Sequence, residues 1–344
     1  MRDPLKLLAA GFARSSPVIL LAAGIFVSVL QLVTFFGAAR LEGTLFIKNG
    51  VGLLNNYGLL STLVGNAVLP YLARLYYEYV CVFAESKAIK RAGVINDGLS
   101  KLKSMILLQG RFRFALYGLI FIGFAFWSAN TSIHTFGDVE AHWGHKVFDS
   151  VDHPMGFYLN RLNNFYTWMI VLPFCGHVMI FCTIQLVRTV TAAADRKAVI
   201  YDLLNPDRCG GFVSIEQAHV VLNLVIAIVY IQITLHTGTF VRMNAEHTIA
   251  YAAATLVLLF GNTMFLGSIY QRVKKLRLDA LNERKKRVYR NDALSLEILK
   301  FFYEHRRSRF MAVNFATKAV AIAVPALVKV APALFESSRP FILL

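Results

Sequence analysis

The chain has 344 residues, of which 56% are hydrophobic and 16% are charged, and its formal net charge is +16 at pH 7. Soluble domains have about 25% charged residues, and the mean hydropathy of +0.53 is too high for a surface that faces water. The composition therefore excludes a soluble globular domain and indicates a membrane protein. Basic residues of membrane proteins gather on the cytoplasmic side, which accounts for the charge, and we do not expect a nucleic-acid partner.

Several stretches are long and apolar enough to cross a bilayer, which takes about 20 residues. In chain order they are 17–39, 58–80, 113–129, 165–187, 218–240 and 248–270. A seventh stretch, 311–335, carries Lys318 and Lys329, so it is either a span or an amphipathic helix in the interface. The sequence predicts an all-α, polytopic membrane protein with six or seven transmembrane helices.

Basic residues are distributed unevenly between the two sides of these spans. If the N-terminus lies inside, the internal segments hold 26 Lys and Arg residues and the external segments hold five. This excess follows the positive-inside rule. The sequence predicts a multi-pass protein of the cell inner (plasma) membrane with a cytoplasmic N-terminus.

Three regions follow from this arrangement. Residues 1–270 form a six-span domain, with a cytoplasmic helical hairpin at 81–112 and a turn at 203–212. Residues 271–310 form a basic cytoplasmic helical segment, and 311–344 hold the seventh span or interfacial helix. Basic segments beside a span attract anionic headgroups by about 1 kcal/mol per charge, so we expect 271–310, with 13 basic residues, to bind them.

The predicted turn reads LLNPDRCGGF and lies between the fourth and fifth spans. Its polar and glycine residues are Asn205, Asp207, Arg208, Gly210 and Gly211. An Asn-Pro pair favours a turn, and paired glycines permit a close approach of the backbone. Asp207 and Arg208 either pair within the turn or contact a phosphate headgroup or an ion.

This stretch resembles a signature of uncharacterised bacterial multi-pass inner-membrane proteins, His-Pro-Asp-(Arg/Lys)-Ala-Gly-Gly-Leu. The likeness covers residues 156–240, and this chain has Asn205 in place of His, Cys209 in place of Ala and Phe212 in place of Leu. The group carries no established activity. The resemblance implies a multi-pass membrane fold and no particular function.

Polar side chains inside the predicted spans are candidates for a functional site because they are costly in lipid. The pathway candidates are His177, His236 and Asn223 within spans, with Asn314, Lys318 and Lys329 on one sector of the seventh stretch. Asn66 and Gln232 also lie within spans. Such amides either join helices or line a route for a proton or solute. Arg74 and Glu78, four residues apart, either pair or reach toward the headgroups.

The predicted external loop 130–164 is rich in histidine and acidic residues. His142 and His145 could share a helical face and are weak metal candidates, but a solvated loop is the preferred interpretation and no metal is expected. The chain has no nucleotide-binding or hydrolase motif. We therefore assign no catalytic residue and no cofactor, and an enzyme is the less favoured class.

Two functions remain open. The polar residues within spans favour a channel or transport-type permeation protein for an ion or small solute. The alternative is a membrane-anchored sensor or interaction protein whose basic helices at 271–310 bind lipid or a partner. Either one is compatible with a homo-oligomer.

Overall fold

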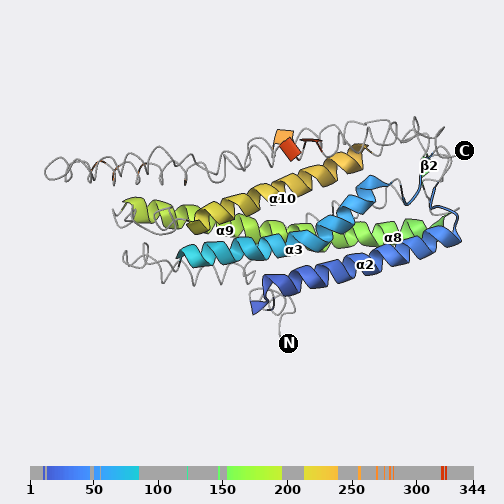
Figure 1. Ribbon diagram of the computed structural model, residues 1–344, viewed down its shortest axis with the longest axis horizontal. Coiled ribbons are helices and arrows are strands. Elements are labelled where there is room, and N and C mark those ends of the chain that lie inside the picture. Colours follow the sequence, from blue (N-terminus) through green and yellow to red (C-terminus); the bar gives the residue numbers. More distant parts are fainter. Residues whose placement is uncertain are drawn as a thin grey trace, which may run out of the picture.

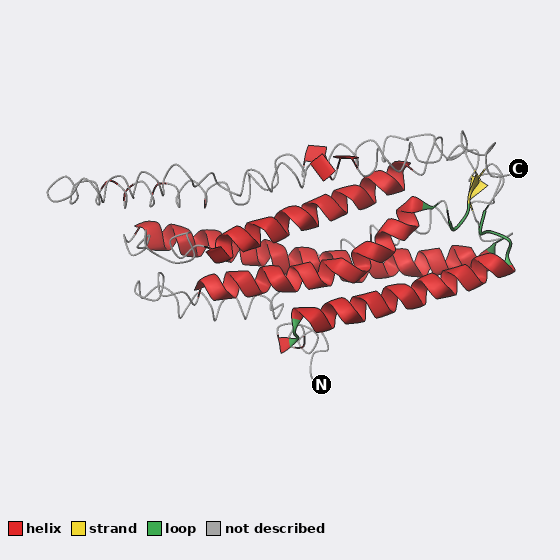
Figure 2. Cartoon of the chain, viewed as in Figure 1, coloured by secondary structure: helices red, strands yellow, loops and turns green. Residues whose placement is uncertain are grey.

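The computed structural model describes residues 14–46, 50–54, 56–84, 153–195 and 213–238, with Gly11 and short pieces elsewhere such as 146–147. Within these residues, four helical stretches are long and apolar enough to cross a membrane (Figures 1 and 2). They correspond to the first, second, fourth and fifth predicted spans. The predicted spans at 113–129, 248–270 and 311–335 lie almost wholly outside the described residues.

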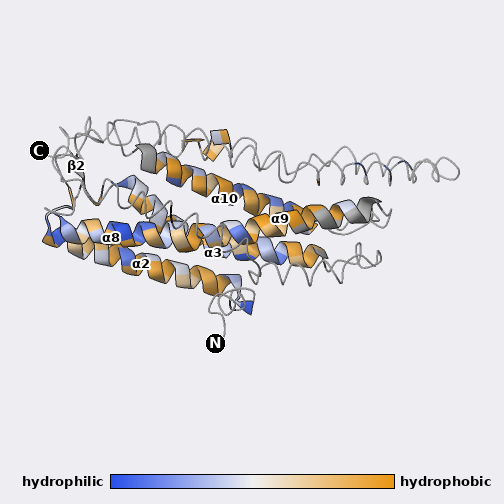
Figure 3. Ribbon diagram, turned by 180° about the vertical axis from the view of Figure 1, so that it is seen from behind, coloured by the Kyte–Doolittle hydropathy of each residue, from blue (hydrophilic) through white to orange (hydrophobic). Residues whose placement is uncertain are grey.

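The first long helix, α2, runs from Pro17 to Leu41. Proline suits a first turn because that turn lacks partners for its N–H groups. Gly43 follows the end of the helix, and its φ of 70° is the left-handed conformation that glycine tolerates best. Only 6% of the most apolar stretch of α2 is buried, and most of its surface is hydrophobic (Figure 3). This outward face is suited to lipid.

Helix α3, Tyr57–Ala84, packs closely along α2. The Asn56 side chain accepts a hydrogen bond from the backbone N–H of Leu59 at 3.0 Å, which caps the start of α3. A Cβ on Gly24 of α2 would lie 2.5 Å from the carbonyl oxygen of Ala67, so the two backbones meet where α2 has no side chain. Small residues permit such close helix contacts in membranes.

The fourth predicted span belongs to a longer continuous helix. It consists of α8 (Pro154–Phe165), the π-helical segment η1 (Tyr166–Val171) and α9 (Leu172–Asp195). The prediction of an external loop at 130–164 is therefore wrong for residues 154–164. Their asparagines interrupted the apolar pattern, but they lie on one side of a helix and are buried against other helices, as Asn163 and Asn164 show.

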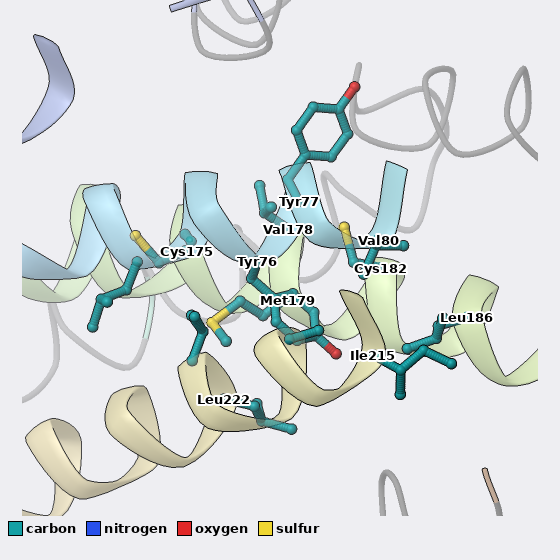
Figure 4. Close-up of a cluster of buried hydrophobic side chains, with 14 of the residues drawn as sticks. Tyr76, Tyr77, Val80, Cys175, Val178, Met179, Cys182, Leu186, Ile215 and Leu222 are labelled. Atoms are coloured by element: carbon teal, nitrogen blue, oxygen red, sulfur yellow. The ribbon is translucent and has the colours of Figure 1, made fainter. Parts of the chain in front are cut away.

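Helix α10, Val213–Gly238, completes the described bundle. Its first half meets α3 and α9 in the main hydrophobic core (Figure 4), which includes Tyr76, Val178, Cys182 and Leu222. Tyr76 points into this core, whereas the ring of Tyr77 points away from it. Two short strands, β1 (Gly50–Val51) and β2 (Lys146–Val147), pair in parallel near the start of α8.

The long helices run in two opposite directions. Thr62, Asn66 and Tyr76 of α3 meet Asn163, Thr167 and Thr183, so α3 runs parallel to the α8–η1–α9 helix. Helices α2 and α10 run antiparallel to α3 (Figure 1). The bundle therefore has one end where α2 finishes and α8 begins, called the Glu42 end, and an opposite end near Arg74.

Candidate functional site: a buried polar cluster

Four polar side chains form a hydrogen-bonded cluster between α3 and the α8–η1 helix. They are Thr62, Asn66, Asn163 and Thr167, and each is at most 6% exposed. The Asn66 amide nitrogen donates to Asn163 Oδ1 at 3.3 Å and to Thr167 Oγ1 at 2.9 Å. Asn163 Nδ2 in turn donates to Thr62 Oγ1 at 3.0 Å. Asn66 precedes Ala67, which lies against Gly24 inside the apolar stretch of α2, so this polar cluster lies level with that apolar stretch.

The direction of every hydrogen bond in the polar cluster is fixed by its two threonines. Thr62 donates its one hydroxyl proton to the carbonyl of Leu59 at 2.7 Å, and Thr167 donates its own to the carbonyl of Asn163 at 2.9 Å. Both hydroxyls can therefore only accept from the amides. Asn163 must turn its NH₂ toward Thr62, and Asn66 must turn its NH₂ toward Asn163 and Thr167.

This orientation uses both amide protons of Asn66 as donors and leaves its side-chain carbonyl oxygen facing none of the other three side chains. Asn66 is 1% exposed, and its Oδ1 has no hydrogen-bond partner within the described part of the chain. A buried acceptor without a donor costs about 1–3 kcal/mol. Every side-chain donor of the polar cluster thus has an acceptor, and one buried acceptor, Asn66 Oδ1, has no donor from the described residues.

The π-helical segment η1 begins just after Asn163 and contains Thr167. A π-helix adds a residue to a turn and is found mostly as a short insertion inside α-helices, frequently at functional sites. Here it changes the register of the helix between the polar side chains of α8 and the apolar residues of α9. It lets one continuous helix present Asn163 and Thr167 to α3 and then Val178 and Cys182 to the core.

Helix α10 adds an amide at the edge of the same region. Gln232 Nε2 donates to the carbonyl oxygen of Ser61 at 3.2 Å. Its side chain lies over Gly65, where a Cβ would be only 1.7 Å from Gln232 Nε2. Any larger residue at position 65 would displace this amide. Asn66 and Gln232 thus both join helices, which is one of the two roles predicted for amides within spans.

At the Glu42 end, a carboxylate caps the start of α8. Glu42 follows α2, and its two carboxylate oxygens accept hydrogen bonds from the backbone N–H groups of Met155 and Gly156 at the start of α8. An anion is stabilised there because the first N–H groups of a helix have no helical partner and carry partial positive charge. One side chain therefore joins the end of one membrane helix to the beginning of another.

Arg74 organises the opposite part of the bundle. Its Nη1 lies 3.3 Å from Glu78 Oε2, its Nε donates to the carbonyl of Ser15 at 3.0 Å, and its guanidinium lies 5.3 Å from the ring centre of Tyr77. Of the two predicted alternatives, the structure has the ion pair. The arginine also fixes the start of α2 against α3.

The main hydrophobic core follows the polar cluster along α3 and extends past the level of Arg74. Tyr76, Val178 and Cys182 are completely buried there. The hydroxyl groups of Tyr76 and Thr183 lie 2.6 Å apart. Because Thr183 gives its proton to the carbonyl of Met179 at 2.8 Å, Tyr76 is the donor of this pair. Within the described helices, the polar cluster therefore lies nearer the Glu42 end and the main hydrophobic core nearer the Arg74 end.

The sequence-predicted pathway residues fall partly within the described residues. His177 and Asn223 are buried, at 5% and 4% exposed, and His177 lies against the ring of Phe181 with 4.4 Å between ring centres. His236 belongs to α10, and only its backbone is described. The remaining predicted residues lie outside the described residues: Asn205, Asp207, Arg208, Gly210, Gly211, Asn314, Lys318, Lys329, His142 and His145.

Sequence reasoning missed Asn163 and Thr167 as site residues. The signal was present, because Asn160, Asn163, Asn164 and Thr167 recur at the spacing of one helical face. Within the described residues no group of three or more histidine, cysteine or acidic side chains could hold a metal ion. The polar cluster offers amide and hydroxyl groups, which bind by hydrogen bonding.

Comparisons with protein-family models, with curated proteins and with solved structures find no match for this chain. The resemblance of residues 203–212 to bacterial inner-membrane proteins stays a prediction. Within the described ranges, the chain has four helices long and apolar enough to cross a membrane, with a polar cluster buried between them.

Proposed function

We propose that the chain is a transport-type permeation protein of the inner membrane that passes an ion or small solute. The observation that carries this proposal is the polar cluster of Thr62, Asn66, Asn163 and Thr167, buried level with the apolar stretch of α2 and beside a π-helical segment. Polar side chains in that environment are expensive and usually serve a pathway. The apolar core around Tyr76 acts in this proposal as a hydrophobic gate, which blocks passage by excluding water.

The proposed architecture has six or seven spans, with the N-terminus in the cytoplasm. The directions of the described helices support it: α3 and α8 begin at the same end of the bundle, so an odd number of crossings must separate them, and the apolar stretch 113–129 supplies one. Alkaline phosphatase fused after Gly43 is expected to be active, and a green fluorescent protein fused after Ala84 is expected to fluoresce. The reverse pattern would overturn the orientation.

Flux across liposomes tests the proposed function directly. The purified chain is reconstituted, and the entry of Na⁺, K⁺, Cl⁻ and small neutral solutes is compared with that in protein-free liposomes of the same composition. We expect at least one of these solutes to cross faster with the protein present. If none does, in either direction of an imposed gradient, the permeation proposal is wrong.

A second candidate is a membrane-anchored sensor or interaction protein. It rests on the 13 basic residues of 271–310, a segment placed by the sequence next to the sixth predicted span. Anionic lipid headgroups are the proposed partner, since each basic residue near the surface contributes about 1 kcal/mol of attraction. The test is whether anionic lipid stays bound through purification and is lost when the basic residues of this segment are neutralised. That result, together with an absence of flux, would favour this candidate over permeation.

A further inference from the structure

The acceptor without a donor in the polar cluster, Asn66 Oδ1, indicates which chemical class of ligand the cluster would bind. Asn66 presents both amide protons to Asn163 and Thr167, and its buried Oδ1 has no partner within the described residues. The threonines allow no other orientation, because each hydroxyl proton is committed to a backbone carbonyl. What the site offers is therefore a hydrogen-bond acceptor, so an anion, which donates no hydrogen bond, does not fit it.

The charges around the polar cluster disfavour a cation as well. The acidic residues of the described helices and their caps stand near helix ends: Glu42, Glu78, Asp195 and Glu216. Glu42 and Glu78 are already engaged with the start of α8 and with Arg74. Arg161, which is basic, lies two residues before Asn163 on the same helix. A cation brought to Asn66 would meet no compensating negative charge from the described helices, which is costly at low dielectric.

We propose that Asn66 Oδ1 binds the hydroxyl or amide N–H group of a small neutral solute, with water as the smallest member of this class. The inference rests on the proposed permeation function and narrows it from ions and solutes in general to neutral hydrogen-bond donors. Asn163 and Thr167 position the carbonyl oxygen by holding the NH₂ group on the other side. The permeant displaces no protein hydrogen bond when it enters.

Stopped-flow light scattering of reconstituted liposomes measures this selectivity. Water, glycerol and urea are the neutral probes, and Na⁺ and Cl⁻ fluxes are measured on the same preparations. We expect wild-type protein to raise the permeability of at least one neutral probe and to leave both ion fluxes at the level of protein-free liposomes. The three neutral probes separate a water pathway from one that also passes larger donors.

The decisive variant is Asn66→Leu, which keeps the shape of the side chain and removes the carbonyl oxygen. We expect it to lower the neutral-solute permeability about tenfold, equivalent to about 1.4 kcal/mol. The control is Ser28→Ala, which removes the 2.8 Å hydrogen bond from Ser28 Oγ to the carbonyl of Leu63, a buried contact outside the polar cluster. It is expected to stay within about twofold of wild type, since it leaves Asn66 and its partners in place.

Asn66→Gln replaces the leucine variant if the latter does not elute as a single species. It retains the amide but shifts the carbonyl by one methylene, and a loss of several-fold is expected. Unchanged neutral permeability in both Asn66 variants would overturn the inference. If liposomes with the wild-type protein pass ions but no neutral probe, the inference is wrong and the permeation proposal stands. If no solute crosses faster than in protein-free liposomes, both are wrong.

Discussion

The hydrogen bond between Tyr76 and Thr183 allows a quantitative test of the apolar core. Tyr76 is the donor, and its ring and hydroxyl are completely buried. Tyr76→Phe removes the donor and leaves Thr183 still donating to Met179, so it should lower the free energy of unfolding by about 1 kcal/mol, as a typical hydrogen bond does. Bonds of this kind within membranes average about 0.6 kcal/mol and reach about 1.7 kcal/mol.

Thr183→Val is expected to cost more, although it is nearly isosteric. It leaves the Tyr76 hydroxyl buried without its acceptor, at a cost of about 1–3 kcal/mol. The double variant replaces both partners by apolar groups of similar shape, so it should be less destabilised than the sum of the single variants. A coupling free energy of about 1 kcal/mol or more is expected.

Unfolding by sodium dodecyl sulfate in mixed micelles, followed by loss of helical circular dichroism, measures these differences. Wild type, both single variants and the double variant complete the cycle. If the two single effects add to within about 0.3–0.5 kcal/mol, the residues are independent. That result would refute the assignment of Tyr76 as donor to Thr183.

Two further predictions concern helix contacts. Gly24→Val should destabilise the chain strongly in the same unfolding assay, because its Cβ would lie 2.5 Å from the carbonyl oxygen of Ala67. Gly37→Val on the same helix should not, since no atom lies within 4 Å of a Cβ there. Equal effects of the two variants would contradict the close contact at Gly24. Glu42→Ala should cost about 1–2 kcal/mol by removing the carboxylate from the start of α8. Glu42→Gln should cost less, because an amide oxygen still accepts, and an equal loss would contradict the capping role.

The apolar spans could be predicted from the sequence because they depend on local composition. Helix α2 was predicted to within two residues of its observed end, since no charged residue interrupts residues 17–39. Helix α8 was missed because a search for unbroken apolar stretches rejects a segment with three asparagines. The periodicity of those asparagines, taken by itself, predicts a helix with one polar face.

The role of Asn66 could not be predicted in the same way. Its partners, Asn163 and Thr167, lie 97 and 101 positions further along the chain. Which amide proton goes to which oxygen depends on the hydroxyl protons of two threonines, and these depend on helix geometry. Sequence alone identifies a polar residue in an apolar stretch. Only the packing of the helices shows that its carbonyl oxygen is the group without a hydrogen-bond donor among the described residues.

The same separation bears on how the chain is made. Helices α2 and α3 can leave the ribosome and pair through Gly24 long before α8 exists. Translation adds about 5–20 residues per second, so Asn66 waits roughly 5–20 s for Asn163 to be synthesised. During this interval its amide is in the bilayer or the insertion machinery without those partners. Biogenesis of this protein therefore includes a stage at which the hairpin of α2 and α3 must be sheltered from lipid, or remain shallow, until α8 has been synthesised.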